Sequence, residues 1–405
     1  MEQEKIIRKT RSYSVNVAGG KVESLRLQED LKTVIRAYED GKVGIAGRIG
    51  EGDDGALFME AQKKLAQNIS YPCVLSEGVV REEDAYKPII PEKEFVRTVK
   101  RLIDRLNARF PDFIFSNKIN MEELETEYSS GRGTRLKYRG NNLILSLVIK
   151  EKTSANIMDL DYSLSGKSYD EDAILSDVGK LLNVYGKKVS FPEEDFPVII
   201  ETSVVQYALS DIVAELYVSG SSLFKGKLGQ KIFDEKVNLL IDRSPDNRDN
   251  IPFFDAEGTI NPDDKFYFVK KGVLCGLATY KRSAQSFSLP LSGSAGAEFD
   301  SVPSFGFGGI KAETCGVKLS QVVKGKAIYI AVAPGGDMTP DGVIAMPVML
   351  AYLYDNGKLV GTLSDFGISA SIFDLLGKDL VAVAENDVFS FKKEDVIVAH
   401  VKIDR

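Results

Sequence analysis

The sequence predicts an α+β protein with two domains: an N-terminal domain of β-hairpins and helices over residues 1–190, and a larger, mainly antiparallel β domain over residues 191–405. Three observations support this prediction. The chain has 405 residues, more than one hydrophobic core usually contains. Hairpin signals and helical periodicities alternate in its first half, whereas short β-type segments dominate its second half. A proline-containing segment near residues 187–197 is the candidate linker.

The N-terminal domain is predicted to contain three hairpins. "SYSVNVAGGKVESLRLQ" has alternating residues on both sides of Gly19-Gly20, and "LKTVIRAYEDGKVGIAGR" has them around Asp40-Gly41. Such pairs adopt the left-handed backbone that two-residue hairpin turns require. A third hairpin is expected in "TRLKYRGNNLILSLVIKEK", with a Gly-Asn turn at 140–142.

Three helices are expected among these hairpins. The first covers residues 56–69, the second lies between Pro91 and Pro111, and the third lies in "DEDAILSDVGKLLN" at 170–183. Apolar residues recur on one face of each of the first two helices, at three- and four-residue spacing. The opposite face of the second helix is basic, and we interpret it as a solvated face, with a subunit or acidic-substrate contact as the alternative; its residues are Arg97, Lys100, Arg101, Arg105 and Arg109.

The C-terminal domain is predicted to open with a strand at 198–200 and a helix. Thr202 or Ser203 is the expected N-cap, and Gly220 is suited to end this helix. The segments that follow are predicted to be strands, apart from a short helix at 369–377. These strands lie at 237–243, 265–280 with a Lys-Gly turn, 326–333, 348–364 around Asp355-Asn356-Gly357, and 394–403.

Bulk composition excludes several classes of protein. The net charge of −7 argues against broad affinity for nucleic acid, which needs a clustered positive field. No run approaches the roughly 18 apolar residues of a membrane-spanning helix, and the N-terminus has no secretory h-region. The three cysteines are far apart, which is typical of small buried side chains in a reducing compartment. We therefore expect a cytoplasmic protein.

Most hydrolytic chemistry is also excluded by the sequence. His400 is the single histidine and lies in the expected C-terminal strand, so a His-Glu-x-x-His zinc helix cannot form. No Gly-x-Ser-x-Gly elbow is present, and neither Cys275 nor Cys315 has a base nearby in the sequence. We therefore assign no catalytic residue and no metal ligand.

Two segments remain as candidates for a site. In "FFDAEG", an extended backbone would place Asp255 and Glu257 on one face roughly 7 Å apart, as in an acid/base pair or an oxygen-ligated metal site. Gly258 and the polar residues 261–264 favour a solvated turn instead. The Gly-rich loop 292–310 lacks a phosphate-loop ending and is a candidate binding loop without a named ligand.

Several segments resemble the TldD/PmbA family, once described as modulators of DNA gyrase. They are, in order, "RAYEDGKVGIAGR", "ALSDIVAELYVSGSSLFKGKLGQKIFDEKVNLLIDRSPD", "FFDAEGT" with "VKKGVLCGLATYKRSA", and "YDNGKLVGTLSDFGISASIFDLLGKDLVAVAEND". No single motif is specific, but the ordered set is. TldD-type chains carry a zinc-binding His-Glu-x-x-x-His helix, which this sequence lacks. The chain therefore resembles the PmbA branch, also called TldE.

The resemblance implies a function. It implies a non-catalytic subunit that pairs with a TldD-like zinc metalloprotease around a shared cavity, and a complex that cleaves unfolded or flexible peptides. Zinc is then expected only in the partner. Because both branches share "FFDAEG", the resemblance makes this segment and the start of the Gly-rich loop candidates for scaffold or cleft-lining residues, namely Asp255, Glu257, Gly258, Ser292, Gly293 and Ser294.

Two alternatives remain open at this point. The chain could be a self-sufficient peptide-binding homodimer without protease activity. It could also be an enzyme that uses carboxylates such as Asp255, Glu257 or Asp337 without histidine. Whether the chain is itself an enzyme is not decided by its sequence.

Overall fold

The computed structural model describes residues 1–192, 196–245, 250–306 and 308–405, and it confirms the α+β class. The N-terminal part is one eight-stranded sheet, ordered β4-β3-β2-β1-β6-β7-β5 with β8 paired to β7. Its strands are β1 (Glu2–Ala18), β2 (Lys21–Glu39), β3 (Lys42–Ile49), β4 (Ile69–Ser70), β5 (Val80–Asp84), β6 (Phe113–Ser130), β7 (Arg135–Glu151) and β8 (Leu160–Gly166).

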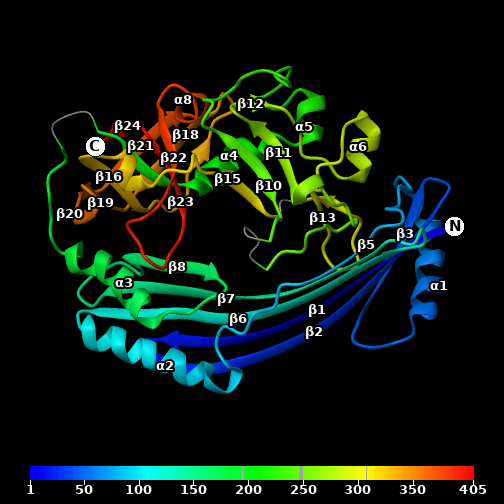
Figure 1. Cartoon of the computed structure of the whole chain (residues 1–405), viewed down its shortest axis with the longest axis horizontal. Helices are drawn as coiled ribbons and strands as arrows, with labels where there is room; N and C mark the ends of the chain where they lie inside the picture. The colour runs from blue at the N-terminus through cyan, green and yellow to red at the C-terminus, as the bar shows by residue number, and fades with distance from the viewer. Residues whose placement is uncertain (193–195, 246–249, 307) are drawn as a thin grey trace.

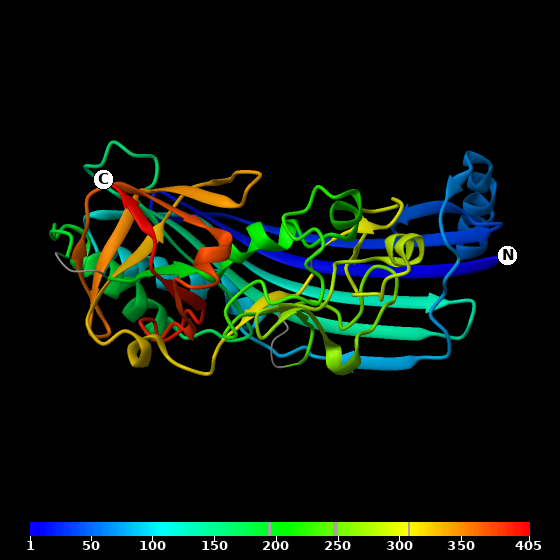
Figure 2. The same cartoon turned by 90° about the horizontal axis from the view of Figure 1, so that it is seen from above.

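Four strands of this sheet are unusually long. β1, β2, β6 and β7 have 17 to 19 residues each, which corresponds to about 60 Å of extended chain. They curve beneath the C-terminal part, whose elements lie over the concave face of the sheet (Figure 1). The view from above shows the same strands extending well beyond the C-terminal sheets toward the N-terminus (Figure 2).

Two of the three predicted N-terminal hairpins are confirmed. Gly19-Gly20 joins β1 to β2 and Asp40-Gly41 joins β2 to β3, all four residues having positive φ. The Gly-Asn turn predicted at 140–142 is wrong, because β7 runs straight through it. The two asparagine side chains instead bind neighbouring segments: Asn141 exchanges hydrogen bonds with the backbone of Lys87, and Asn142 donates to Ser165.

Three helices accompany the sheet, as predicted: α1 (Asp54–Lys64), α2 (Glu92–Arg109) and α3 (Glu171–Tyr185). The first is shorter than expected, since Asn68 adopts a left-handed conformation and Ile69 belongs to β4. The basic face of α2 is partly occupied. Arg101 and Arg105 both form ion pairs with Glu171 at the start of α3, which ties the two helices together.

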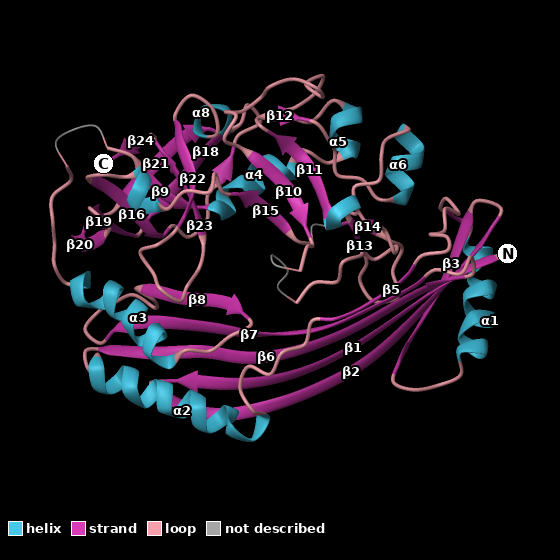
Figure 3. Cartoon of the chain, viewed as in Figure 1, coloured by secondary structure: helices cyan, strands magenta, loops and turns pink. Residues whose placement is uncertain are grey.

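The C-terminal part contains four sheets, mostly antiparallel (Figure 3). A six-stranded sheet has the order β20-β19-β16-β9-β23-β22, and two four-stranded sheets have the orders β12-β11-β10-β15 and β17-β18-β21-β24; β13 and β14 form a small hairpin. The strands are β9 (Val198–Glu201), β10 (Asn238–Asp242), β11 (Lys265–Lys270), β12 (Val273–Leu274), β13 (Ala295–Gly296), β14 (Ser304–Phe305), β15 (Ile310–Glu313), β16 (Lys326–Val332), β17 (Asp337–Met338), β18 (Val343–Val348), β19 (Leu350–Asp355), β20 (Lys358–Thr362), β21 (Phe366–Ser371), β22 (Leu380–Glu385), β23 (Asp395–Ala399) and β24 (Lys402–Asp404).

The helix predicted after the 198–200 strand is interrupted. A 3-10 turn at Thr202–Val204 leads into α4 (Val205–Ser210), and α5 (Ala214–Ser219) follows. The break arises because the backbone of Ile212 and Ala214 pairs with Ala278 instead of continuing the helix. Gly220 ends α5 with a φ of 84°, as predicted. The remaining helices are α6 (Lys281–Phe287), α7 (Leu319–Val322) and α8 (Ile372–Leu375), the last within the predicted segment.

Other local predictions have mixed outcomes. The Lys271-Gly272 and Asn356-Gly357 turns are confirmed, with positive φ at all four residues. His400 lies between β23 and β24 rather than inside one strand. The cysteines were expected to be buried, and this is wrong: Cys275 and Cys315 are exposed, and Cys73 is half-buried.

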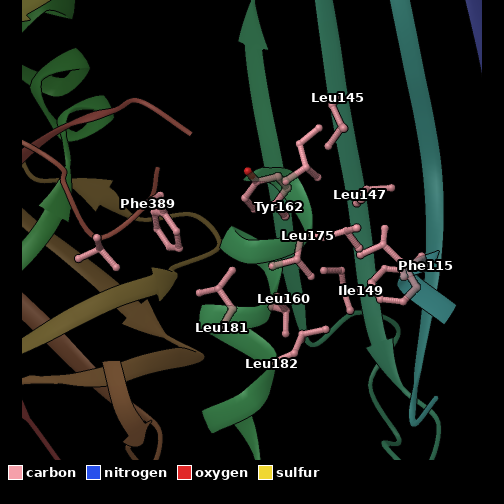
Figure 4. Packing of buried hydrophobic residues seen from close by; sticks show 14 of the residues in the cluster. Phe115, Leu145, Leu147, Ile149, Leu160, Tyr162, Leu175, Leu181, Leu182 and Phe389 are labelled. Carbon is pink, nitrogen blue, oxygen red and sulfur yellow. The ribbon is translucent and has the colours of Figure 1, made fainter. Parts of the chain in front are cut away.

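One hydrophobic core joins the two parts of the chain. Side chains from β7, β8 and α3 pack together, and Phe389 from the loop after β22 belongs to the same cluster (Figure 4). Asp177 on α3 is fully buried there and accepts backbone N–H bonds from the C-terminal loop 390–392. In the predicted linker, Lys187 and Val189 form backbone hydrogen bonds with Thr362 on β20, and residues 193–195 are outside the described residues.

Candidate functional site

The "FFDAEG" segment forms a tight turn whose carboxylate is held by backbone amides. Asp255 Oδ1 accepts from the N–H of Glu257 at 2.9 Å and of Thr259 at 2.8 Å, and Oδ2 accepts from the N–H of Ala295 at 3.1 Å. Gly258 N–H closes the turn on the carbonyl of Asp255. The Asp255 side chain therefore connects this turn to the Gly-rich loop.

The turn was predicted correctly, but its predicted solvation is wrong. Asp255 is 6% exposed and Glu257 is fully buried. Both carboxylates are covered because the turn lies between the C-terminal sheet and the long N-terminal sheet, a contact that no local sequence pattern specifies. Buried carboxylates need hydrogen-bond partners, and both have them.

Glu257 accepts one hydrogen bond from each of the two parts of the chain. The hydroxyl of Tyr71 donates to Oε1, and the backbone N–H of Lys281 donates to Oε2 at 2.8 Å. Burial, with a smaller contribution from the charge of Asp255, raises the pKa of Glu257 to about 7. Its hydrogen bonds and the Lys281 charge act in the opposite direction but do not prevail.

Glu257 should therefore make stability depend on pH. Because its pKa is higher in the folded than in the unfolded chain, its favourable contribution is complete below the ordinary value of 4.5 and is lost as pH rises through about 7. We expect Glu257→Gln to remove this loss, worth up to about 3 kcal/mol in the free energy of unfolding between pH 5 and pH 8. Urea unfolding at both pH values measures it.

Glu298→Gln is the matched control, because Glu298 is an exposed carboxylate on the neighbouring loop. This control should keep the pH dependence of the wild type. If Glu257→Gln keeps that dependence as well, the assignment of the titration to Glu257 is wrong.

Gly258 is required by its backbone and by its neighbour. Its φ is 69°, and a Cβ built there would lie 2.4 Å from the ring of Tyr128 on β6. Its carbonyl also accepts a hydrogen bond from Ser76 Oγ at 3.0 Å. Gly258 thus allows the turn to pack directly against the N-terminal sheet.

The other predicted residues, Ser292, Gly293 and Ser294, lie beside this turn. Ser292 and Ser294 are fully buried, and their hydroxyls lie 2.7 Å apart. Ser292 also exchanges hydrogen bonds with Thr279, and its carbonyl accepts from Asn261. The structure therefore gathers all six predicted residues into one buried cluster.

An ion network that the sequence analysis missed lies next to this cluster. Glu4 on β1 is fully buried and accepts from Lys281 Nζ at 2.8 Å. It also accepts from the hydroxyls of Tyr38 at 2.9 Å and Tyr128 at 2.7 Å, and Arg36 lies 3.4 Å away. Burial alone would raise the pKa of Glu4, but the charges of Lys281 and Arg36 lower it overall.

A cavity of about 740 Å³ opens between this network and the Gly-rich loop. The long sheet forms one wall, including Arg8, Lys32 and Arg36, and the turn and loop form the other. Arg243, directly after β10, also lines the cavity although it is only 3% exposed. Burial lowers the pKa of Arg243, while the charges of Asp255 and Asp264 raise it.

Some of these residues carried weak sequence signals. Arg36 interrupts the apolar alternation of "TVIRAYE", and Arg243 ends the apolar run "VNLLIDR". A charged residue in an otherwise apolar strand indicates a buried partner. Glu4 gave no such signal, because its partner Lys281 is 277 residues away in the sequence.

The donors in this site do not fit a zinc ion. Among the described residues, no group of three or more histidine, cysteine, aspartate or glutamate side chains gathers at one point. Each carboxylate oxygen of Asp255 and Glu257 already accepts a hydrogen bond. We therefore derive no metal-dependent step from this cluster. In the same described ranges, no helix combines the length and the hydropathy needed to cross a bilayer.

Known proteins resemble the chain over most of its length. Residues 193–405 match the family described as PmbA/TldA metallopeptidase C-terminal domain, and residues 6–61 match PmbA/TldA metallopeptidase domain 1. A metalloprotease of Archaeoglobus fulgidus is 21% identical over 91% of this chain and 89% of its own length. Metalloprotease MJ0996 of Methanocaldococcus jannaschii is 24% identical over 46% of this chain, which covers only 43% of that protein.

Solved structures share the fold. TldE from Thermococcus kodakarensis superposes with a TM-score of 0.84 at 17% identity, covering all of this chain and 97% of that one. A protein from Thermotoga maritima, proposed to modulate a DNA gyrase, gives a TM-score of 0.77 at 16% identity, covering all of this chain and 95% of that one. With more than half of its residues matched by the metallopeptidase C-terminal domain, the chain belongs to the TldD/PmbA family.

Proposed function

We propose that this chain is a non-catalytic, TldE-like subunit of a TldD-type zinc metallopeptidase whose complex cleaves unfolded or flexible peptides. One observation carries the proposal: the two carboxylates of the turn that forms part of the cavity wall are buried, and every one of their oxygens accepts a hydrogen bond from within the chain. A general base or a metal ligand would have to face its substrate or its metal ion instead. The cavity wall can therefore contact a peptide without cleaving it.

Two further facts support this assignment. The whole sequence has a single histidine, so the zinc site of such a complex would have to lie in another chain. The similarity to TldE of Thermococcus kodakarensis extends over the entire chain, not over one domain. In this proposal the zinc belongs to a TldD-like partner, and the complex acts in the cytoplasm.

The proposal is tested by mixing the purified chain with the TldD-like protein of the same organism. We expect no zinc and no cleavage of a flexible, quenched-fluorescence peptide by the chain alone, and zinc-dependent cleavage by the mixture. Size-exclusion chromatography with light scattering should show a complex of the two chains. The partner alone is the control.

Two results would contradict the proposal. Homodimers of this chain that bind peptides but neither associate with nor activate a TldD-like protein would favour the peptide-binding alternative. Cleavage by the chain alone, lost in Asp255→Asn, would favour the carboxylate-based enzyme.

A further inference from the structure

Arg243 differs from the other buried cations of the site in having too few partners. Lys281 and Arg36 both face the carboxylate of Glu4. Among the described residues, Arg243 has one hydrogen bond, from Nη2 to the carbonyl of Gly293 at 2.9 Å. Its Nε and Nη1 are buried and find no hydrogen-bond partner in these described ranges. Among the described residues, no carboxylate forms a salt bridge with it.

The two carboxylates whose charges act on Arg243 are already committed. Asp264 forms a two-pronged ion pair with Arg81, with both N–O distances at 2.7 Å. Asp255 accepts hydrogen bonds from three backbone N–H groups. A buried guanidinium with unsatisfied N–H groups is costly, and an anion from outside would remove that cost.

Two glycines of the Gly-rich loop lie against the guanidinium of Arg243, which lines the cavity. A Cβ at Gly293 would lie 3.2 Å from Nη1 of Arg243, and one at Gly308 would lie 3.3 Å from Nη2. Side chains at these positions would crowd both ends of the guanidinium. Glycine at both positions therefore leaves space beside these two nitrogens.

The rest of the cavity indicates the charge and character of the anion. Among the described residues, its wall has four cations, Arg8, Lys32, Arg36 and Arg243, against two carboxylates, Asp255 and Glu298. This excess of positive charge favours an anionic ligand. Apolar residues also line it, among them Ile6, Leu124 and Phe254. A volume of about 740 Å³ is within the range of pockets that hold a ligand of several residues.

We propose that Arg243 anchors a carboxylate-binding subsite in this cavity and that the bound group is a carboxylate of a peptide. This inference rests on the proposed function, and it adds the chemical feature by which the chain recognises its peptide. The guanidinium would donate its unpartnered N–H groups to the carboxylate in charge-assisted hydrogen bonds, which are stronger than those between neutral groups. The carboxylate comes either from the peptide C-terminus or from an acidic side chain.

Fluorescence anisotropy with the purified full chain distinguishes these sources. The probes are four labelled heptapeptides of glycine, serine and alanine: a free acid, a C-terminal amide, and two amides with one central glutamate or glutamine. We expect the free acid, the glutamate peptide or both to bind at least tenfold more tightly than the matched uncharged peptide, about 1.4 kcal/mol. Inorganic phosphate at matched ionic strength should compete weakly.

Variants connect this preference to one side chain. Arg243→Met should abolish the preference, and Arg243→Lys should retain part of it, because lysine keeps the charge but loses the fork. Arg97→Gln, on the exposed face of α2, is the control and should bind like the wild type. Thermal unfolding of each variant confirms that it is folded. The comparison of the free-acid peptide with its C-terminal amide is made on the wild type and therefore needs no variant.

The proposal is overturned if charged and uncharged peptides bind the wild type equally, or if none of the peptides binds. It is also overturned if folded Arg243→Met keeps the preference. These results are independent of the partner test. A chain that activates a TldD-like protein but ignores the carboxylate refutes only the subsite. A chain that binds carboxylate peptides but neither associates with nor activates a TldD-like protein refutes only the subunit role.

Discussion

Replacing Glu4 by glutamine is expected to destabilise the protein by about 3–5 kcal/mol, the cost of breaking a buried ion pair from one side. Lys281 and Arg36 would remain buried, 4% and 2% exposed, without a negative charge. In the wild type, each oxygen of Glu4 accepts hydrogen bonds from a tyrosine hydroxyl and a cation. The NH2 group of the new glutamine would therefore face hydrogen-bond donors and find no acceptor among them. Urea unfolding at pH 7 measures the loss.

Two further variants test the origin of this effect. Glu2→Gln is the matched control on the same strand, since Glu2 and its partner Arg132 are both more than one third exposed. It should cost at most about 1 kcal/mol. Combining Glu4→Gln with Lys281→Met should restore part of the stability, because the uncompensated charge is removed. If the losses of stability of Glu4→Gln and Lys281→Met simply add in the double variant, the broken ion pair is not the cause of the destabilisation.

The pH dependence of this effect is opposite in sign to that of Glu257. Because the pKa of Glu4 is lower in the folded chain, its stabilisation is present above the ordinary value of 4.5 and is lost as pH falls through the folded pKa. The wild type should therefore lose stability in acid, and Glu4→Gln should lose less. This difference separates the two carboxylates experimentally.

The second large effect is expected at Asp177. Its carboxylate accepts from the backbone N–H of Ser390 and Phe391, both at 2.7 Å, and of Lys392 at 3.1 Å. Lys180 donates to it as well, at 3.0 Å. Asp177→Ala would leave these donors without an acceptor inside the shared core, which we expect to cost about 3–5 kcal/mol.

Guanidinium unfolding of Asp177→Ala measures this cost, with Asp172→Ala as the control. Asp172 lies on the same helix and is 83% exposed, so its change should be small. Because the carboxylate of Asp177 joins the two parts, we also expect the unfolding transition of Asp177→Ala to broaden or divide. A single transition at the wild-type midpoint would contradict the assigned role.

The sequence predicted the features that short segments determine. The turns at Asp40-Gly41, Lys271-Gly272 and Asn356-Gly357 are confirmed because the left-handed preference of these pairs is local. Family membership was also recognisable, because several sequence segments resemble those of the family and occur in the same order along the chain. The six candidate residues lie together in the structure, where Asp255 accepts a hydrogen bond from the N–H of Ala295 in the Gly-rich loop; their role as cleft-lining or scaffold residues stays a prediction.

Long-range contacts account for what the sequence did not predict. The burial of Asp255 and Glu257 comes from the N-terminal sheet, which local polarity cannot reveal. The false turn at 140–142 has the same origin, since Asn141 binds Lys87 in the loop after β5 and Asn142 binds Ser165 on β8. The partnership of Glu4, Arg36 and Lys281 requires the folded topology, so residue type alone could not identify it.

The pairing of Glu4 with Lys281 also has a consequence during biosynthesis. A ribosome that adds 5–20 residues per second needs about 15–55 s to travel the 277 residues between them. For most of that interval β1 and β2 have already been synthesised, while the cation that their buried carboxylate requires has not. The concave face of the sheet must therefore remain hydrated and incompletely folded until most of the chain has emerged.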